Sequence, residues 1–177
     1  MSLTNREFWT LIHGMVLGAL FLLSFGGGLA GFYSLRPDLT TEKGIDERLV
    51  RLKLGTALMA VVAWLTVITG TYIVYPWYRA GPPEGTTDLT EFPRSFLLAN
   101  PNLAAWHTFG MEWKEHIAWI APIMATVVAY LVFRYGRSLA FNSQLRTIAV
   151  VLFFIAFITA AIAGIFGALI TKAAPIL

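Results

Sequence analysis

Four long apolar runs, separated by polar connectors, constrain the fold of this chain more than any other feature of its sequence. They predict helices over about residues 5–35, 50–76, 101–136 and 143–171. At about 1.5 Å per residue, each run is long enough to cross a hydrocarbon core of about 30 Å. The sequence therefore predicts an all-α, polytopic membrane protein with four transmembrane helices in an up-down bundle, forming a single domain over residues 1–177.

The composition supports a membrane location and excludes several kinds of cofactor. Hydrophobic residues make up 57% of the chain and charged residues 13%, whereas soluble domains average about 25% charged residues. The sequence contains no cysteine, which excludes disulfides, thiolate metal sites, iron–sulfur clusters and covalently attached c-type haem. The net charge is only +3 and no basic cluster is present, so the expected partner is the lipid bilayer and not a nucleic acid.

Local signals mark the beginning and the shape of several helices. Thr4 and Glu7 have the spacing of a capping box at the start of the first helix. The apolar run that follows is too long for the hydrophobic region of a signal peptide, so it is interpreted as a retained transmembrane helix. Pro101 is expected at the first position of the third helix, and Pro122 is expected to open a helical hydrogen bond to Ala118. The charged second half of the first connector is a candidate extension of the second helix.

The distribution of Lys and Arg predicts the orientation in the membrane. The first and third connectors carry eight of these residues, whereas the termini, the second connector and the front of the third helix carry five. By the positive-inside rule, the first and third connectors face the cytoplasm and both termini face outward. The expected location is the inner (cytoplasmic) membrane of a bacterium.

Three histidines, His13, His107 and His116, are all expected toward the outer membrane face. Ionisable residues within apolar segments are costly and by default indicate a functional site. Two neutral imidazoles on neighbouring helices are the ligand set of a b-type haem, with one imidazole on each face of the iron. Two alternatives remain open: the histidines form only interhelical hydrogen bonds, or they bind another metal or a pigment such as chlorophyll.

The third helix offers two candidate partners for His13. His107 and His116 are nine residues apart, which places them about 180° apart around the helix at about 100° per residue. We favour His116 as the metal ligand, because the charged sequence EWKEH is expected to make His107 the more solvated residue; His107 is the alternate. The Glu112 carboxylate, four residues before His116, is a candidate for orienting its ring, although a solvated face is an equally good interpretation.

Residues around the histidines fit the needs of a macrocycle. Small residues let a flat ring approach the helix backbone, and cations at the membrane edge would bind its propionates. The candidates for these two roles are Gly14, Gly18 and Gly110, and Arg6, Lys114 and Arg79. Pairs of small residues four positions apart also predict close packing of the first and fourth helices, within the chain or against another subunit. These pairs are Gly14 and Gly18, Gly27 and Gly31, Ala160 and Gly164, and Ala163 and Gly167.

With one histidine in the first helix and another at the start of the third, the chain resembles small membrane-anchor cytochromes b. The resemblance is one of architecture and not of a specific motif. It implies a non-catalytic electron-transfer subunit of a respiratory or photosynthetic redox complex, with one haem b near the outer face. A quinone or a periplasmic redox subunit would exchange electrons with it, beside other membrane subunits. The chain lacks the inner-face histidines of the di-haem members. The alternative is a haem-free structural subunit of a larger membrane complex.

Overall fold

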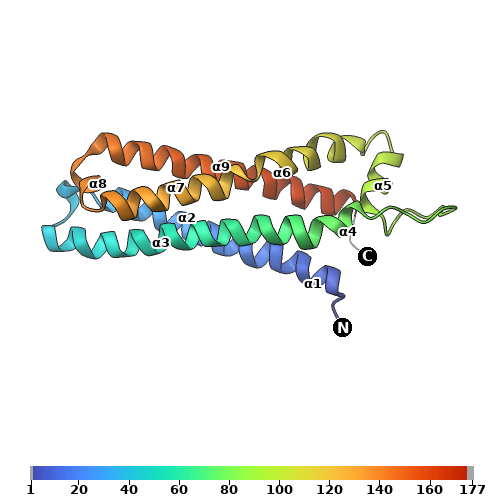
Figure 1. Ribbon diagram of the computed structural model, residues 1–177, viewed down its shortest axis with the longest axis horizontal. Coiled ribbons are helices and arrows are strands. Elements are labelled where there is room, and N and C mark those ends of the chain that lie inside the picture. The colour runs from blue at the N-terminus through green and yellow to red at the C-terminus, as the bar shows by residue number, and fades with distance from the viewer. Residues whose placement is uncertain (1, 175–177) are drawn as a thin grey trace. The chain divides into compact units, whose positions relative to one another are not determined.

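The computed structural model describes residues 2–174, and every regular element within that range is helical (Figure 1). The helices join into four spans that are long and apolar enough to cross a membrane: Asn5–Ser34, Glu42–Arg79, Trp106–Tyr135 and Ser143–Ala173. The predicted number of spans is thus confirmed, and the chain has the character of an integral membrane protein.

The elements follow one another in an order that alternates regular α-helix with short segments of other helical geometry. They are α1 (Asn5–Leu11), η1 (Ile12–Val16), α2 (Leu17–Ser34), η2 (Pro37–Leu39), α3 (Glu42–Thr69), η3 (Gly70–Val74), α4 (Tyr75–Arg79), α5 (Pro93–Ala99), η4 (Trp106–Met111), α6 (Glu112–Ile117), α7 (Ile120–Tyr135), α8 (Ser138–Phe141) and α9 (Ser143–Ala173). The short segment η2 is a 3-10 helix, whereas η1, η3 and η4 are π-helical.

The predicted signals at Thr4 and Pro122 act where the sequence places them. Thr4 caps α1, and both hydrogen bonds of its capping box with Glu7 are present. The third span contains a turn at Ala118 and Trp119, between α6 and α7. Pro122 has no N–H to donate to the carbonyl of Ala118, four residues earlier, so the regular ladder is interrupted at this point, as predicted.

Two boundaries differ from the expectation. The second span begins at Glu42 and not near residue 50, because the charged half of the first connector extends the helix, the alternative that the sequence left open. The third span begins at Trp106 and not at Pro101. Asn100 instead ends α5, and its side-chain oxygen accepts a hydrogen bond from the backbone N–H of Asn102 at 3.0 Å, which holds Pro101 in a turn.

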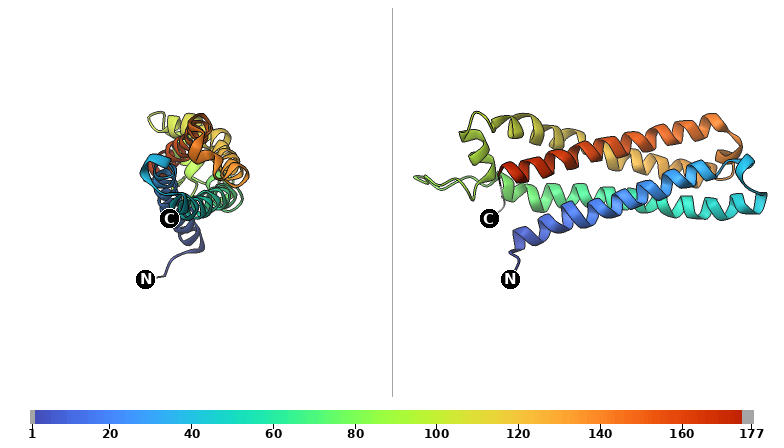
Figure 2. Two further views of the ribbon diagram at one scale, coloured as in Figure 1. Left: turned by 90° about the vertical axis from the view of Figure 1, so that its left-hand side faces the viewer. Right: turned by 180° about the vertical axis from the view of Figure 1, so that it is seen from behind.

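The chain divides into two compact units, and each of the four spans contributes one stretch to each unit. Unit 1 comprises residues 1–18, 65–119 and 160–177, and unit 2 comprises residues 19–64 and 120–159. In unit 1, the beginning of α1 and the end of α9 lie at the same end as α4 and α5 (Figures 1 and 2). Unit 2 contains the two connectors that join α2 to α3 and α7 to α9.

The core of unit 2 is built from aromatic rings that stack between α2 and α9. The ring centroid of Phe25 lies 3.9 Å from that of Phe157 and 5.0 Å from that of Phe153. Phe32 meets Phe153 edge to face at 5.6 Å. Gly28 makes this packing possible, because a Cβ atom there would lie 2.5 Å from Cζ of Phe153. The helices approach closely at Gly28 and not at the predicted Gly27, where a Cβ would meet nothing within 4 Å.

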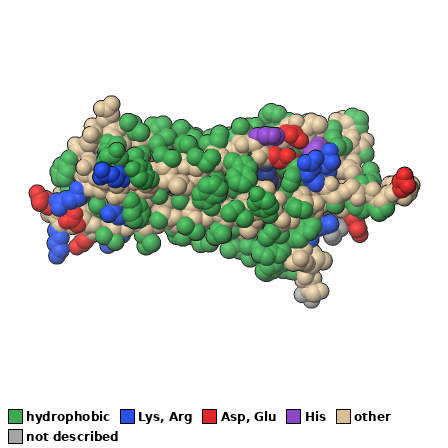
Figure 3. Space-filling view, viewed as in Figure 1, with side chains coloured by type: hydrophobic (Ala, Val, Ile, Leu, Met, Phe, Trp, Pro, Cys, Tyr) green, Lys and Arg blue, Asp and Glu red, His purple; other side chains and the backbone are tan. Residues whose placement is uncertain are grey.

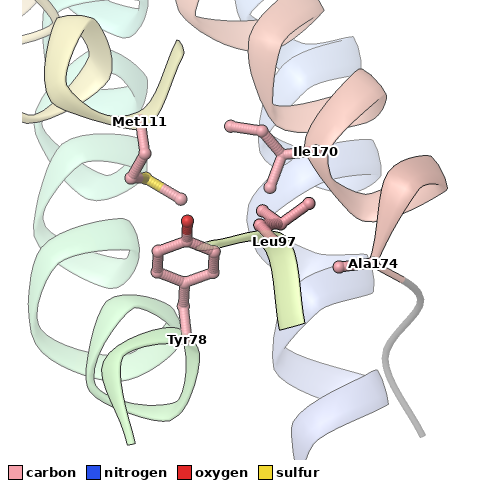
Figure 4. Packing of buried hydrophobic residues seen from close by; sticks show 5 residues of the cluster. All are labelled: Tyr78, Leu97, Met111, Ile170 and Ala174. Atoms are coloured by element: carbon pink, nitrogen blue, oxygen red, sulfur yellow. The ribbon is translucent and has the colours of Figure 1, made fainter. Parts of the chain in front are cut away.

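Unit 1 has a smaller apolar core that ties the second connector to the spans. Tyr78, Leu97, Met111, Ile170 and Ala174 form this cluster and come from four segments, namely α4, α5, η4 and the end of α9 (Figure 4). Leu97 belongs to α5, a helix inside a connector that was expected to be non-helical. The side chain of Leu97 is fully buried, so α5 is packed into unit 1 and holds its neighbours in place above the spans.

Candidate cofactor site

His13 lies in η1 and faces η3. Its Nδ1 lies 3.1 Å from the hydroxyl oxygen of Thr69. The imidazole rests against the backbone of η3 at Gly70, where a Cβ atom would lie 2.7 Å from Cε1 of the ring. Gly70 is therefore required for this close approach, and any larger residue there would displace the histidine.

The hydrogen bonds of Thr69 favour one tautomer of His13. The Thr69 hydroxyl lies 2.7 Å from the carbonyl of Leu65 and 3.1 Å from that of Thr66. A hydroxyl that donates to either carbonyl accepts from Nδ1 of His13, because it carries only one hydrogen. This assignment leaves the lone pair of His13 on Nε2, the atom with which a neutral imidazole binds a metal.

His116 has the same tautomer for a different reason. Its Nδ1 lies 2.7 Å from the backbone carbonyl of Glu112. A carbonyl only accepts, so Nδ1 is the donor and the lone pair again lies on Nε2. The sequence suggested that the Glu112 carboxylate orients the ring. In the structure the backbone carbonyl of Glu112 does so instead. The reason is the helical register, which brings the side chain at position i+4 back over the carbonyl at position i.

Both ring nitrogens of His107 form hydrogen bonds. It lies in η4, where its Nδ1 is 2.9 Å from the Tyr78 hydroxyl, and its Nε2 accepts from Nε of Arg94 at 3.3 Å. It is only 6% exposed, whereas His116 is an exposed residue. The expectation that His107 is the more solvated of the two was wrong, because α5 covers it and brings Arg94 onto the ring.

The contacts of the third span divide its residues among three faces. His107 meets Tyr78 of α4, whereas Gly110 and Lys114 meet Phe166 and Gly167 of α9. His116 lies on a third face, which is exposed. His13 therefore faces η3, whereas His116 lies on the exposed face of α6. The structure does not show His116 in contact with His13.

The glycines proposed to admit a macrocycle behave differently from one another. A Cβ atom at Gly14 or Gly18 would meet nothing within 4 Å, so the backbone beside His13 is open to a ligand. At Gly110 a Cβ would already lie 3.6 Å from side-chain atoms of Phe166 and Ile170. Gly110 thus serves the packing of the third span against α9, and its predicted role beside a macrocycle is not supported by this contact.

The three candidate cations also differ in their surroundings. Arg6 donates to the carbonyl of Glu91 in the second connector, at 3.5 Å. Arg79 donates to the Tyr75 hydroxyl at 3.1 Å and lies over the Tyr75 ring. Lys114 turns inward, and a Cβ atom at Gly167 would lie 2.8 Å from its ammonium nitrogen. Of the three, Lys114 is the cation held against an apolar helix.

Glu115 is a carboxylate that sequence reasoning missed. It follows His107 by eight residues, and it shares with that histidine the face toward α4, where it hydrogen-bonds the Tyr75 side chain. Its Oε1 is buried, and it is the one buried side-chain polar atom in the described part of the chain without a hydrogen-bond partner. Unpaired buried oxygens are costly, so this atom is suited to accept a hydrogen bond from a bound hydroxyl. Figure 3 shows acidic, basic and histidine side chains together on this part of unit 1.

Among residues 2–174, no group of three or more His, Asp or Glu side chains gathers as a metal-binding set. A haem iron needs only axial side chains, because the macrocycle supplies its remaining ligands. Neutral imidazoles at His13 and His116, with Nδ1 donating and Nε2 carrying the lone pair, have the state that a metal-bound histidine adopts. No protein-family model, curated protein or solved structure matches this chain.

Proposed function

We propose that this protein is a membrane-embedded electron-transfer subunit that holds one b-type haem. The observation that carries the proposal is the shared state of His13 and His116. In both rings Nδ1 donates a hydrogen bond, which leaves the Nε2 lone pair available for iron. A bound haem would supply one-electron redox chemistry, and the protein would tune its potential through the ligands and their burial.

His13 is the ligand that the proposal depends on most. Its ring is held by Thr69 and Gly70, and the backbone at Gly14 and Gly18 is open beside it. His116 is preferred to His107 as the second ligand, because Arg94 already occupies Nε2 of His107. Arg6, Lys114 and Arg79 all lie within the spans and are the cations available for the propionates.

The proposed orientation places this site toward the outer face of a bacterial cytoplasmic membrane. It rests on the eight-to-five distribution of Lys and Arg, which puts both termini outside in an up-down bundle. The second connector, with Asp88 and Glu91, would then be the docking surface for a periplasmic redox partner. Other membrane subunits of the complex would pack against the spans.

A quinol is the electron donor that the polar part of unit 1 supports. The unpartnered Oε1 of Glu115 would accept a hydrogen bond from a quinol hydroxyl, and Tyr75, which Arg79 contacts, would help to hold the carboxylate in place. Removal of electrons from a quinol releases protons, and a carboxylate at the edge of the membrane is suited to take one.

The second candidate function is a haem-free structural subunit, and it too has a specific observation behind it. His13 bonds Thr69 on the second span, and His107 bonds Tyr78 there and Arg94 of α5. Such bonds hold neighbouring helices together without any cofactor. In this case His13 would contribute to packing alone.

The two functions are separated by a reduced-minus-oxidised absorption spectrum of the detergent-purified chain or its native complex, with pyridine haemochrome quantification. We expect one haem b per chain, lost in His13→Ala and His116→Ala and retained in His107→Ala, the matched control. Haem that persists in both of the first two variants would refute the ligand assignment. A folded wild-type chain without haem would establish the structural subunit.

A further inference from the structure

A groove of about 260 Å³ opens between α2 and α9 in unit 2, which contains none of the residues proposed to hold the haem. Its walls are apolar and include Leu29, Phe32, Val150 and Val151. Its mouth carries two guanidinium groups, those of Arg36 and Arg146. An apolar groove closed by cations at one end has the polarity of a lipid, with an acyl chain below a phosphate.

The depth of the groove in the spans matches such a ligand. The first span ends at Ser34 and the fourth begins at Ser143, so both arginines lie within three residues of a span end. The apolar walls lie inside the spans, at the depth of the hydrocarbon. Leu29 lies five residues before the end of α2 at Ser34, or about 7.5 Å of helix at about 1.5 Å per residue. Arg36 lies beyond that end, which places the cations at the depth of the headgroups.

Arg146 is held in a fixed position and still has donors to offer. Its Nη1 donates to the carbonyls of Leu139 and Ala140, at 2.8 and 2.7 Å. Within residues 2–174 these are the hydrogen bonds that its guanidinium makes, so Nε and Nη2 remain available. A guanidinium with two adjacent donors is suited to bind a phosphate bidentately.

Arg36 contributes less charge, because Asp38 pairs with it. Nη2 of Arg36 lies 2.6 Å from Oδ2 of Asp38. The hydrogen bonds from Arg36 hold the pKa of the Asp38 carboxyl below its ordinary value, so Asp38 is ionised at neutral pH. The mouth of the groove therefore carries two positive charges and one negative, and remains net positive through Arg146.

We propose that this groove binds an anionic phospholipid, with an acyl chain along Val150, Val151 and Phe32 and the phosphate at Arg146. A zwitterionic lipid would fill the apolar part equally well but would gain less from the net positive mouth. Basic sites between spans at the cytoplasmic side of a membrane are suited to anionic headgroups. The site is independent of the haem proposal, because its residues belong to unit 2 and not to the histidine-bearing unit.

The test is native mass spectrometry of the full chain, released from detergent after incubation with phosphatidylglycerol or phosphatidylcholine. We expect the wild type to retain phosphatidylglycerol selectively and Arg146→Gln to bind it about fivefold more weakly. The matched control is Arg134→Gln, which removes the same charge from an exposed arginine of α7 that does not line the groove. Equal losses in the two variants would refute the site, since they would reflect the overall charge alone.

A second pair of variants fills the groove without changing any charge. Val151→Trp is expected to lower retention of phosphatidylglycerol, whereas Ile148→Trp, at an exposed position of α9 outside the groove, is expected to leave it unchanged. Equal retention of both lipids by the wild type would overturn the proposal. So would a wild-type dimer that Val151→Trp converts to a monomer, because the groove would then be covered by a second copy of the chain.

Discussion

The two units of this protein differ in what holds them together. Unit 2 is packed mainly through apolar and aromatic contacts between α2, α3 and α9, as at Phe25, Phe153 and Leu52. Unit 1 contains all three histidines and all three π-helical segments of the described chain. π-helical segments carry a local cost and occur frequently at functional sites. The difference indicates that unit 2 supplies packing, whereas unit 1 gives up regular helix to position polar side chains.

The largest expected effect tests the packing of unit 2. In Gly28→Ala the new Cβ atom would lie 2.5 Å from Cζ of Phe153, whose ring is already stacked on Phe25 and cannot move freely. We expect this variant to lower the free energy of unfolding by about 2–3 kcal/mol, measured by thermal or denaturant unfolding in detergent.

Gly27→Ala is the matched control for this variant, because a Cβ atom at Gly27 meets nothing within 4 Å. Its free energy of unfolding is expected to stay close to that of the wild type. Equal destabilisation by the two substitutions would show that the contrast between the two adjacent glycines, and with it the apolar account of unit 2, is incorrect.

A smaller effect is expected when the polar network of unit 1 is broken. His107→Ala removes the partner of the Tyr78 hydroxyl and leaves Arg94 without its acceptor. We expect a loss of about 1–2 kcal/mol in the free energy of unfolding, because a buried hydroxyl is left unsatisfied. The absorption spectrum of the haem should be unchanged.

The variant His107→Ala/Tyr78→Phe provides the check on this prediction. Replacing both partners removes the unsatisfied hydroxyl, so the double variant should be no less stable than His107→Ala alone. A double variant whose losses simply add would mean that the Tyr78–His107 hydrogen bond contributes nothing.

The sequence predicted the spans well and the histidine environments poorly, for a physical reason. Apolar length alone determines where a helix crosses a membrane, so the run from Ser143 to Ala173 was recognisable from residue types. The burial of His107 depends on Arg94, thirteen residues away in a helix of the second connector. No periodic pattern in the sequence predicts such a contact, because the contact depends on how α5 folds back onto the third span.

The sequence also did not predict which faces of the helices pack against which neighbours. The spacing of small residues predicted close approach at Gly27 and Gly31, but Gly28 meets α9 and Gly31 meets Leu52 of α3. A stripe of glycines identifies a face that can pack closely and does not identify the neighbour. The sequence likewise distinguished His107 from His116 but did not identify which of the two becomes buried.

The smallest expected effect concerns the tautomer of His13, on which the function depends. Thr69→Val removes the acceptor of the Nδ1 proton and keeps the shape of the side chain. Interhelical hydrogen bonds in membranes average about 0.6 kcal/mol, so stability should change little. The ring would no longer be fixed, and the reduction potential of a haem bound at Nε2 should shift, because the hydrogen-bond partner of a ligating histidine tunes its basicity and orientation.

Redox titration of the Thr69→Val protein measures this shift. Thr159→Val is the control, because the Thr159 hydroxyl also donates to a carbonyl four residues earlier in its own helix but belongs to unit 2, which contains no histidine. An unchanged potential in Thr69→Val, with haem bound, would show that His13 is not the ligand that Thr69 orients. A shift of the potential at nearly constant stability would separate a role in ligand positioning from a role in packing. This outcome would also assign a functional role to unit 1, because a haem-free structural subunit has no haem whose reduction potential could shift.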